Sequence, residues 1–466
     1  MGGTKYRTEA DSMGKVIVPR DALYGAQTQR AINNFTIAKS SMRWEFIEAL
    51  LFIKLAACKA NNELSLLDND STQGIEKAIK SLLEDEPLEQ FPVAILQTGS
   101  GTSTNMNVNE VVANLVNSRS NSSLVSPNDH INLGQSSNDV IPASIHVANS
   151  RGAVNTLLPS IKTLQRTILD FGATHSDVIK TGRTHLMDAL PMKLQAEMEA
   201  WAAQLEESTE RIESCLSRLS RLPLGGTAIG SGVNSHPDFP QKVTHYLSEL
   251  TGLNFTPAPS KYKNISSLDT IVEYSGHMKT LAISLSKIAN DLRWMNSGPH
   301  SGLAEISLPS LQPGSSIMPA KVNPVIPEAV CMAAAQVIGN DTTISLGALG
   351  GNFQLNTMLP LVAEKTLESL ELLSGSCESL ATKAIKGMKV NRDNIQKPLL
   401  LNPILVTALN PIIGYQNAAE IGKTAQKEKR TVLDVALEKT DIPRKELERL
   451  LDPKNLADGN DRRSKR

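Results

Sequence analysis

Hydrophobic positions recur every three, four or seven residues along much of the chain, a spacing typical of helices that bury one face. The longest such stretch runs from Pro191, which suits a first helical turn, to Arg221, just before Pro223. Its apolar stripe consists of Met198, Trp201, Leu205, Ile212, Leu216 and Leu219. At about 1.5 Å per residue we expect a helix roughly 45 Å long, which favours a long bundle over a compact globule.

Three further stretches predict long helices, at residues 143–171, 266–296 and about 355–390. Gly152 and Pro159 are candidate kinks within the first of them. Strand-like alternation is short and is clearest from Lys15 to Pro19. We therefore predict a mainly α-helical protein with a central bundle of long helices.

Polar, glycine-rich segments separate the predicted helices, and such loops often carry function when rigid elements hold them. They cover residues 97–110 (QTGSGTSTNMNVNE), 126–139 (SPNDHINLGQSSND), 180–191 (KTGRTHLMDALP), 222–234 (LPLGGTAIGSGVN) and 313–324 (PGSSIMPAKVNP). The charged tail, residues 458–466, is expected to be a solvated terminus.

The chain's totals narrow the function classes. Its 466 residues suggest more than one domain, and 40% hydrophobic with 20% charged residues is an ordinary globular composition. With 47 basic and 48 acidic residues the net charge is -1, which argues against a nucleic-acid or membrane surface. A dianionic ligand would have to be held by local groups.

The four cysteines are scattered without a CxxC pair, and the eight histidines show no HExxH spacing. We therefore expect reduced, buried thiols and neither a disulfide framework nor a metal site. The N-terminus shows no targeting segment, and no apolar run is long enough to span a bilayer, so a cytoplasmic protein is expected.

Candidate chemistry is densest in residues 313–324. Prolines and Gly314 shape this loop, which displays Ser315, Ser316, Lys321 and Asn323. Hydroxyls, an ammonium and an amide can bind a carboxylate through charge-assisted hydrogen bonds. A serine could also act as a base if its alkoxide were stabilised. Taken alone, the loop could equally be a flexible surface segment.

The other polar segments add groups of the same kind. Neutral donors occur at Ser100–Thr102 and Ser136–Asn138, and Thr184 precedes His185 at the entrance to the longest predicted helix. Together these groups could grip two carboxylates and move one proton.

The five segments resemble the fumarase/aspartase superfamily, in order and over nearly the whole chain, from about Tyr6 to Ala457. GSSIMPAKVNP is similar to that family's signature loop. GRTHLMDALP, LPLGGTAIGSGVN and LVTALNPIIGY look like class II fumarase in particular. The resemblance implies a homotetramer whose active sites combine segments of three subunits. It also implies three domains, at residues 1–137, 138–394 and 395–466, with the middle one supplying the tetramer core.

The resemblance also assigns roles residue by residue. Ser315 matches the catalytic base, His185 the proton donor and acceptor, and Glu328 its charge partner. Lys321 and Asn323 match substrate-carboxylate ligands. The remaining pocket groups match Ser100, Gly101, Thr102, Ser136, Ser137, Asn138, Thr184 and Ser316. The implied reaction is the reversible anti addition of water to fumarate, giving L-malate in the tricarboxylic acid cycle, without metal or cofactor.

Two departures from the family pattern matter. A secondary dicarboxylate site often begins with histidine, where this chain has Ser126 followed by Asn128 and Asp129. The signature loop contains Ala320 and continues as VNPVIPE, a sequence that resembles that of aspartases. Aspartate ammonia-lyase is therefore the alternative function. His185 favours fumarase, because many aspartases carry glutamine there. A lens-type structural protein is disfavoured by the intact catalytic positions, and a serine hydrolase by the lack of a GxSxG elbow.

Overall fold

The computed structural model describes residues 5–119 and 124–458. The chain forms two compact units, each assembled from three stretches of sequence. The first unit comprises Met1–Pro159, Ser208–Ala282 and Ala334–Ser374, and the second comprises Ser160–Glu207, Ile283–Ala333 and Gly375–Arg466. The division into three domains at residues 137 and 394 stays a prediction. Of the charged tail, only Asp458 lies within the described residues.

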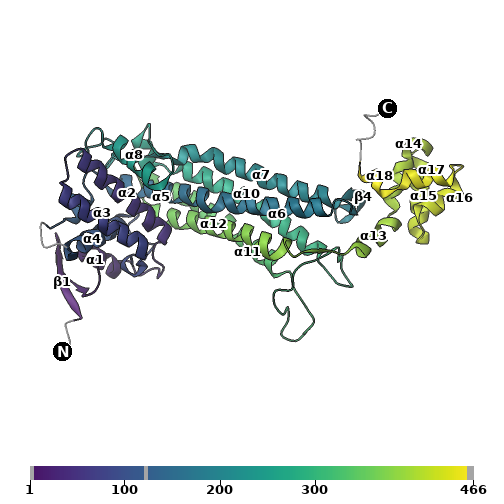
Figure 1. The fold of residues 1–466 in the computed structure, drawn as a ribbon, viewed down its shortest axis with the longest axis horizontal. Coiled ribbons are helices and arrows are strands. Elements are labelled where there is room, and N and C mark those ends of the chain that lie inside the picture. The colour runs from purple at the N-terminus through teal and green to yellow at the C-terminus, as the bar shows by residue number, and fades with distance from the viewer. Residues whose placement is uncertain (1–4, 120–123, 459–466) are drawn as a thin grey trace. The chain divides into compact units, whose positions relative to one another are not determined.

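Helices dominate the first unit (Figure 1). Its helices and helical turns are α1 (Ala26–Asn34), α2 (Trp44–Glu63), α3 (Asn69–Asp85), η1 (Leu88–Gln90), α4 (Thr102–Arg119), η2 (Pro127–Ile131), α5 (Ser137–Gly152), η3 (Ala153–Leu157), α8 (Phe239–Thr251) and α9 (Lys261–Ser266). Residues on all sides of α2 are buried, as expected of a helix that is apolar all round and packs against α3, α5 and α8. This helix therefore forms the centre of the unit.

Five long helices confirm the predicted bundle. They are α6 (Leu158–Thr174), α7 (Leu194–Leu219), α10 (Asp269–Met295), α11 (Val325–Ala348) and α12 (Leu359–Ser379), which continues into the turn η4 (Leu380–Ile385). The stripe predicted for α7 is buried except at Leu216, which is half-buried beside the buried Cys215. Gly152 and Pro159 flank the π-helical turn η3, so the predicted irregularity between α5 and α6 is also confirmed.

Polar side chains link the long helices laterally within each unit. In the first unit, Arg218 of α7 pairs with Glu273 of α10, and Lys279 of α10 with Asp341 of α11. In the second unit, the indole N–H of Trp201 on α7 donates to Asp291 on α10 over 3.2 Å. Pairs of this kind set which helix faces meet, while the apolar stripes provide most of the stabilisation.

The prediction for residues 180–191 is wrong in one respect. This segment is a β-hairpin, β3 (Ile179–Thr184) paired antiparallel with β4 (Met187–Lys193), and not a loop leading directly into a helix. Pro191 consequently lies in β4, and α7 begins three residues later at Leu194. A proline is tolerated there because a two-stranded sheet has only edge strands.

The prediction for residues 97–110 is also wrong in part, because most of that polar segment is helix α4, which begins at Thr102. The remaining strands form short two-stranded sheets. They are β1 (Tyr6–Asp11) with β2 (Gly14–Pro19), β5 (Arg221–Leu222) with β6 (Thr256–Pro257), β7 (Ile306–Ser307) with β10 (Lys389–Val390), and β8 (Gly351–Asn352) with β9 (Leu355–Asn356). The strand expected at Lys15–Pro19 is confirmed as β2.

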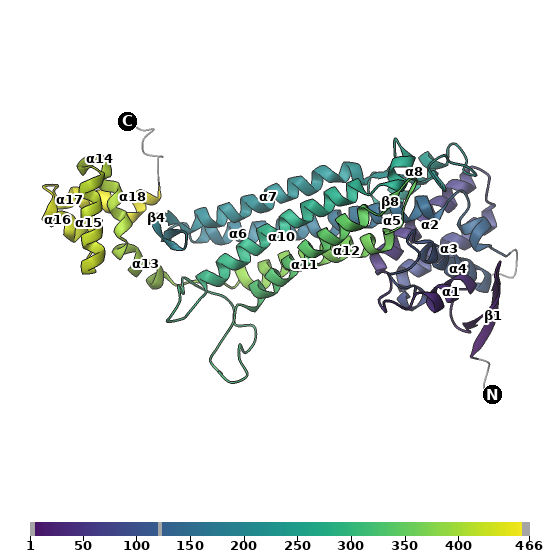
Figure 2. The same cartoon turned by 180° about the vertical axis from the view of Figure 1, so that it is seen from behind.

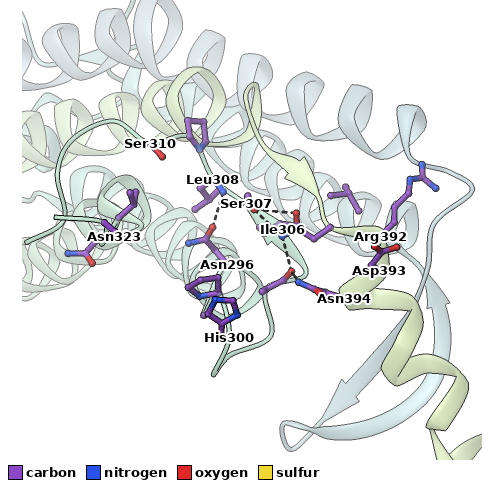
Figure 3. A pocket seen from close by; sticks show the side chains of 18 residues that line it. Asn296, His300, Ile306, Ser307, Leu308, Ser310, Asn323, Arg392, Asp393 and Asn394 are labelled. Atoms are coloured by element: carbon purple, nitrogen blue, oxygen red, sulfur yellow. Dashed lines mark hydrogen bonds between the residues drawn. The ribbon is translucent and has the colours of Figure 1, made fainter. Parts of the chain in front are cut away.

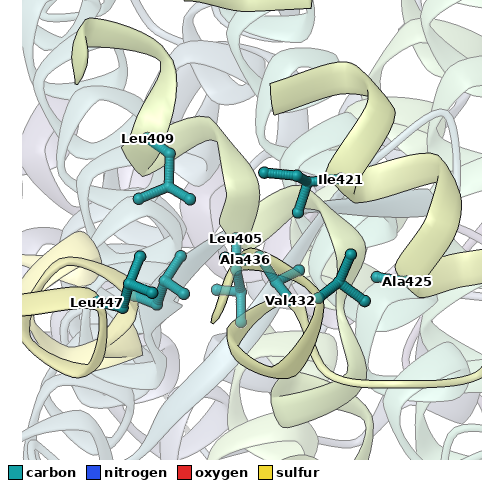
Figure 4. Close-up of a cluster of buried hydrophobic side chains, with 9 residues drawn as sticks. Leu405, Leu409, Ile421, Ala425, Val432, Ala436 and Leu447 are labelled. Carbon is teal, nitrogen blue, oxygen red and sulfur yellow. The ribbon is translucent and has the colours of Figure 1, made fainter. Parts of the chain in front are cut away.

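The C-terminal part of the second unit is a cluster of short helices (Figure 2). These are α13 (Arg392–Leu401), η5 (Pro403–Leu409), α14 (Asn410–Ile413), α15 (Tyr415–Glu428), α16 (Val432–Lys439), α17 (Arg444–Leu451) and α18 (Pro453–Ala457). Figure 4 shows their shared core, in which Leu409, Ile421, Val432 and Leu447 come from four different elements. Within the described residues, no helix combines the length and apolarity needed to cross a bilayer.

Candidate active site

The serine-bearing loop of the second unit is closed at its base. The Gly314 N–H donates to the Lys321 carbonyl over 2.8 Å, and the Asn323 side-chain amide donates to the Gly314 carbonyl over 2.8 Å. A Cβ at Gly314 would lie 2.6 Å from the Lys321 oxygen, so any larger residue would force the two ends of the loop apart. The closure holds the intervening residues as a defined projection.

Ser315 lies at the start of that projection and is half-buried. Its Oγ accepts hydrogen bonds from the backbone N–H groups of Ile317 (3.2 Å) and Met318 (3.1 Å). Two N–H dipoles directed at one oxygen stabilise negative charge on it. Ser316 and Lys321 are exposed on the same loop, and Asn323 uses one of its two amide N–H groups to close the base.

His185 occupies the tip of the β3–β4 hairpin. Thr184 pairs with Met187, so His185 and Leu186 form a two-residue turn with φ values of 56° and 61°. Turns of this type favour asparagine and glycine, because left-handed backbone costs about 1–2 kcal/mol for other residues. Strain of this kind persists where the surroundings impose it, often at functional sites. Thr184 and His185 are both exposed in the single chain.

A buried ion cluster fixes the base of this hairpin. Glu305 lies 2.9 Å from the Lys180 ammonium and 2.7 Å from the Arg183 guanidinium, and Lys180 also contacts Glu197 at 2.7 Å. The side chains of Glu305 and Lys180 are each 3% exposed. On the other strand, the Asn402 amide donates to the Ala189 carbonyl over 2.8 Å. The hairpin's position is therefore set by charge pairing at its base.

Glu328 lies in the first turn of α11 and is half-buried. Among the described residues of this single chain, no hydrogen bond or ion pair links His185 with Glu328 or with Ser315. The structure thus places the predicted base and acid on separate projections of the second unit and does not itself pair them.

In the first unit, two predicted pocket segments lie beside each other at the starts of α4 and α5. The hydroxyl oxygens of Ser100 and Thr102 are 2.9 Å apart. Gly101 has φ +74°, and a Cβ on it would lie 2.8 Å from Ile141 of α5, so glycine permits the close approach of the two helices. Asn105 of α4 donates to the Ser137 hydroxyl over 3.0 Å.

The start of α5 is held by a capping box. Ser136 Oγ accepts from the Asn138 N–H (3.2 Å), while Asp139 accepts from the Ser136 N–H (2.9 Å) and from the Thr227 N–H (2.9 Å). Burial raises the pKa of Asp139 to about 7, although these backbone donors oppose the rise. The Asn138 amide donates to the Ala228 carbonyl over 2.8 Å, which joins residues 222–234 to the start of α5.

At the predicted secondary dicarboxylate site, the Ser126 hydroxyl donates to the Asp129 carboxylate over 2.9 Å. The Ser126 N–H donates to His130 Nδ1 over 2.8 Å, so that ring is already engaged in the turn. Asp129 thus presents a carboxylate where a dianion would have to bind, which disfavours binding. The secondary site stays a prediction.

The second unit contains a cavity of about 780 Å³, and one residue of the predicted site, Asn323, lines it (Figure 3). Ala320 and Val322 of the same loop also line it, and the rest of the lining comes from residues 296–310, which include the turn around His300 and strand β7, and from residues 390–394 of β10 and the start of α13. Asn391 and Asn394 both donate to the Ala304 carbonyl, over 2.9 and 3.0 Å, and brace its wall. This cavity could not be predicted from the sequence, because its lining residues have ordinary loop composition.

Three of the four thiols are buried, as expected. Cys58, Cys215 and Cys377 are buried and free, and burial raises the pKa of each to about 12, so none is a reactive thiolate. Cys331 is half-buried and also free. Across residues 5–119 and 124–458, no group of three or more His, Cys, Asp or Glu side chains is arranged to hold a metal ion.

Comparison with known proteins decides the family. A lyase family matches residues 14–339, and the C-terminal domain of fumarase C matches residues 405–458. The chain is 52% identical to fumarate hydratase class II 2 of Pseudomonas aeruginosa, over 98% of this chain and 99% of that one. It is 53% identical to fumarate hydratase class II of Xylella fastidiosa strain Temecula1, over 98% of this chain and 96% of that one.

The chain belongs to the class II fumarate hydratase family. Among solved structures, the class II fumarase of Schistosoma mansoni superposes with a TM-score of 0.94 at 35% identity, covering 97% of this chain and 99% of that one. A fumarate lyase:delta crystallin from Brucella melitensis bound to cobalt superposes with a TM-score of 0.92 at 38% identity, covering 97% and 99%. The fumarase/aspartase-like fold is thereby confirmed.

Sequence reasoning missed several residues that support the site of this fumarase. Lys180, Arg183 and Glu305 fix the hairpin, and Lys54 and Asp139 lie buried behind the start of α5. Charged residues in a sequence are usually solvated, so neither composition nor spacing marks these as interior. Only the fold shows that Lys54, Asp139, Lys180 and Glu305 are buried and that Arg183, half-buried, pairs with Glu305.

Proposed function

We propose that this class II fumarate hydratase interconverts fumarate and L-malate by anti addition of water, with Ser315 as the base. The observation that carries the assignment is the geometry at Ser315 Oγ, which receives two backbone N–H groups inside a loop closed by Gly314 and Asn323. A serine alkoxide is unstable in water, and those donors are what a basic oxygen there requires.

In the direction from malate to fumarate, Ser315 removes the proton from C3. The negative charge spreads into the neighbouring carboxylate, and donors must be in place where it develops. The exposed Lys321 ammonium and the second N–H of the Asn323 amide are the groups of the loop that can bind it. Ser316 adds a hydroxyl donor on the same loop.

His185 protonates the departing C2 hydroxyl, and Thr184 beside it adds a hydroxyl to the pocket. The left-handed turn presents the imidazole at the tip of the hairpin and away from the protein body. A carboxylate beside an imidazole favours its charged form, which is the role proposed for Glu328. Ser100, Thr102, Ser137 and Asn138 supply neutral donors at two helix N-termini, where anions are favoured.

The active enzyme is proposed to be a homotetramer, with each site built from three subunits and no metal or other cofactor. The exposed His185 and the half-buried Ser315 of the single chain support this, because full desolvation of both must come from elsewhere. Helix α11 and the residue that follows it, Leu349, also expose large apolar side chains, which a subunit interface would cover. They are Met332 (68% exposed), Ile338 (40%), Leu346 (62%) and Leu349 (80%).

The first test follows fumarate by its ultraviolet absorbance in the presence of a chelator, with L-malate and L-aspartate as separate substrates. We expect absorbance to rise with malate alone. A rise with aspartate alone would favour aspartate ammonia-lyase, and activity restored only by added metal would contradict a cofactor-free site.

The second test compares Ser315→Ala with Ser310→Ala, an exposed serine just before the loop, as a matched control. Loss of the base should lower kcat by at least about a hundredfold, the usual contribution of a positioned general base, while the control stays near wild type. A Ser315→Ala enzyme with near-normal turnover would remove Ser315 from this role.

A further inference from the structure

A lysine buried in the first unit controls the amides behind the start of α5. Lys54 of α2 is 1% exposed, and its Nζ donates to Asn132 Oδ1 (3.0 Å) and Gln135 Oε1 (3.1 Å). An ammonium carries donors and no acceptor. Both amides must therefore present oxygen to the lysine, which fixes their orientation.

The orientation passes from Asn132 to its neighbours. Asn132 Oδ1 also accepts from the amide nitrogens of Asn105 (3.1 Å) and Asn109 (3.2 Å). The Oδ1 atoms of Asn105 and Asn109 are buried without a hydrogen-bond partner among the described residues. An unpaired buried carbonyl costs about 1–3 kcal/mol, so these amides are held in place by what faces their nitrogens.

Ser137 is the end of this chain of contacts. The Asn105 nitrogen that donates to Asn132 also donates to Ser137 Oγ over 3.0 Å. Because the Asn105 N–H group occupies one lone pair of Ser137 Oγ, the serine hydroxyl hydrogen is free to point outward, toward a ligand. In the described part of the chain, Ser137 Oγ has Asn105 as its hydrogen-bond partner and no other.

We propose that Lys54 is a positioning residue that fixes Ser137 as a hydrogen-bond donor to a substrate carboxylate, acting through Asn132 and Asn105. The inference rests on the binding role proposed above for Ser137. Without the lysine, the Asn132 amide keeps the 3.2 Å bond from its nitrogen to the Gln135 carbonyl but loses the cation that requires its oxygen, so Asn132 and then Asn105 can rotate by half a turn. Ser137 would then donate inward and turn a lone pair toward the carboxylate.

An ion pair between Lys54 and Asp139 is the simpler reading of the same region, and the contacts argue against it. Asp139 is held by the backbone N–H groups of Ser136 and Thr227, whereas the lysine's hydrogen bonds go to neutral amides. Burial lowers the pKa of Lys54 to about 7, which the charge of Asp139 opposes. The neutral amine keeps two N–H groups, enough for the same two bonds, but it also has a lone pair, so the ammonium form is the one that requires oxygen from both amides.

The test is a double-variant cycle in the full-length enzyme, using Lys54→Met, Ser137→Ala and the pair. The readouts are KM for fumarate, kcat, and competitive inhibition by succinate. Each single variant should raise KM and the succinate inhibition constant about tenfold, the factor for one hydrogen bond to a charged group, with a smaller change in kcat. In the Ser137→Ala background, Lys54→Met should add less than about twofold.

Asn61→Ala is the matched control. Asn61 lies on the same helix, is 1% exposed, and donates to the Leu133 backbone carbonyl over 2.9 Å, so it supports the same segment without touching the side chain of Asn132. It should lower the melting temperature and leave KM within about twofold of wild type. The proposal is overturned if the KM increases of Lys54→Met and Ser137→Ala multiply in the double variant. It is also overturned if Asn61→Ala raises KM as much as Lys54→Met does.

If Lys54→Met does not yield folded enzyme, Asn105→Asp decides. Aspartate matches asparagine in size but only accepts, so it forces the Ser137 hydrogen inward. KM should rise at least about tenfold, and in the Ser137→Ala background by less than about threefold; an unchanged KM would refute the proposal. A wild-type enzyme that makes no fumarate from malate would instead remove the proposed function.

Discussion

Replacing Glu305 by glutamine removes the negative charge from the base of the hairpin that carries His185. The carboxylate contacts Lys180 at 2.9 Å and Arg183 at 2.7 Å, and its side chain is 3% exposed. Glutamine keeps the size and one carbonyl oxygen, so the change tests charge with little change in packing.

The expected loss follows from burial. Removing one partner of a buried ion pair costs about 3–5 kcal/mol, because the remaining charge stays buried without compensation. Lys180 keeps Glu197 at 2.7 Å, and the Arg183 side chain is 20% exposed, so water screens part of the loss. We therefore expect a value near the lower end, about 3 kcal/mol.

Hydrogen exchange of the β3–β4 peptides, followed by mass spectrometry, measures this locally. A loss of about 3 kcal/mol corresponds to roughly 150-fold faster exchange through local opening. Turnover should fall as well, since the hairpin presents His185. Glu197→Gln is the control, because Glu197 is 20% exposed and contacts Lys180 alone in this cluster; we expect about 1 kcal/mol or less. Exchange within twofold of wild type for Glu305→Gln, or equal effects of both variants, would refute the reasoning.

Three further predictions concern other parts of the fold. Burial lowers the pKa of His146 from 6.5 to about 4, so its neutral ring favours the folded state above pH 6.5; that contribution is lost as pH falls toward 4, up to about 3 kcal/mol. In acid titrations monitored by circular dichroism, His146→Gln should reduce the loss of folding stability between pH 6.5 and about pH 4. An unchanged profile would contradict this. Gly99→Ala would place a Cβ 1.9 Å from the Thr357 carbonyl and should destabilise the first unit by at least about 1–3 kcal/mol in urea unfolding, whereas Gly375→Ala, which meets open space, should not. Leu186→Gly should relieve the left-handed strain and stabilise the hairpin by about 0.5–1 kcal/mol in hydrogen exchange, yet lower kcat by loosening His185; unchanged kcat would show that the strained turn does not position the imidazole.

The long helices could be predicted because the apolar residues that form their buried stripes recur in the sequence at helical spacing. The stripe of α7 from Met198 to Leu219 follows the helical period over its whole length. The hairpin at residues 179–193 was missed because its strands contain Gly182 and Pro191 and its turn is His-Leu, none of which signals a strand pair. Tertiary contacts impose that structure, and a sequence pattern does not report them.

The candidate site divides in the same way. The roles of Ser315, His185 and their neighbours could be proposed from motif resemblance, because the sequences of those loops are similar to the family's motifs. The contacts that support Ser315 could not be predicted from the sequence. The closure at Gly314 and the backbone donors to Ser315 Oγ depend on how the loop folds back. The asparagines of α4 illustrate the limit: they suggested a loop, but they are buried and bond to other segments.

The contacts of Asp139 and Asn138 with the backbone of Thr227 and Ala228 carry a consequence for sequence divergence. Both contacts use main-chain atoms of the partner segment, so they constrain the path of residues 222–234 and not the side chains displayed there. Across the family, that segment should resist insertions and deletions more strongly than substitutions. A change of length there would pull on the start of α5, and compensation would have to arise at positions 138 and 139.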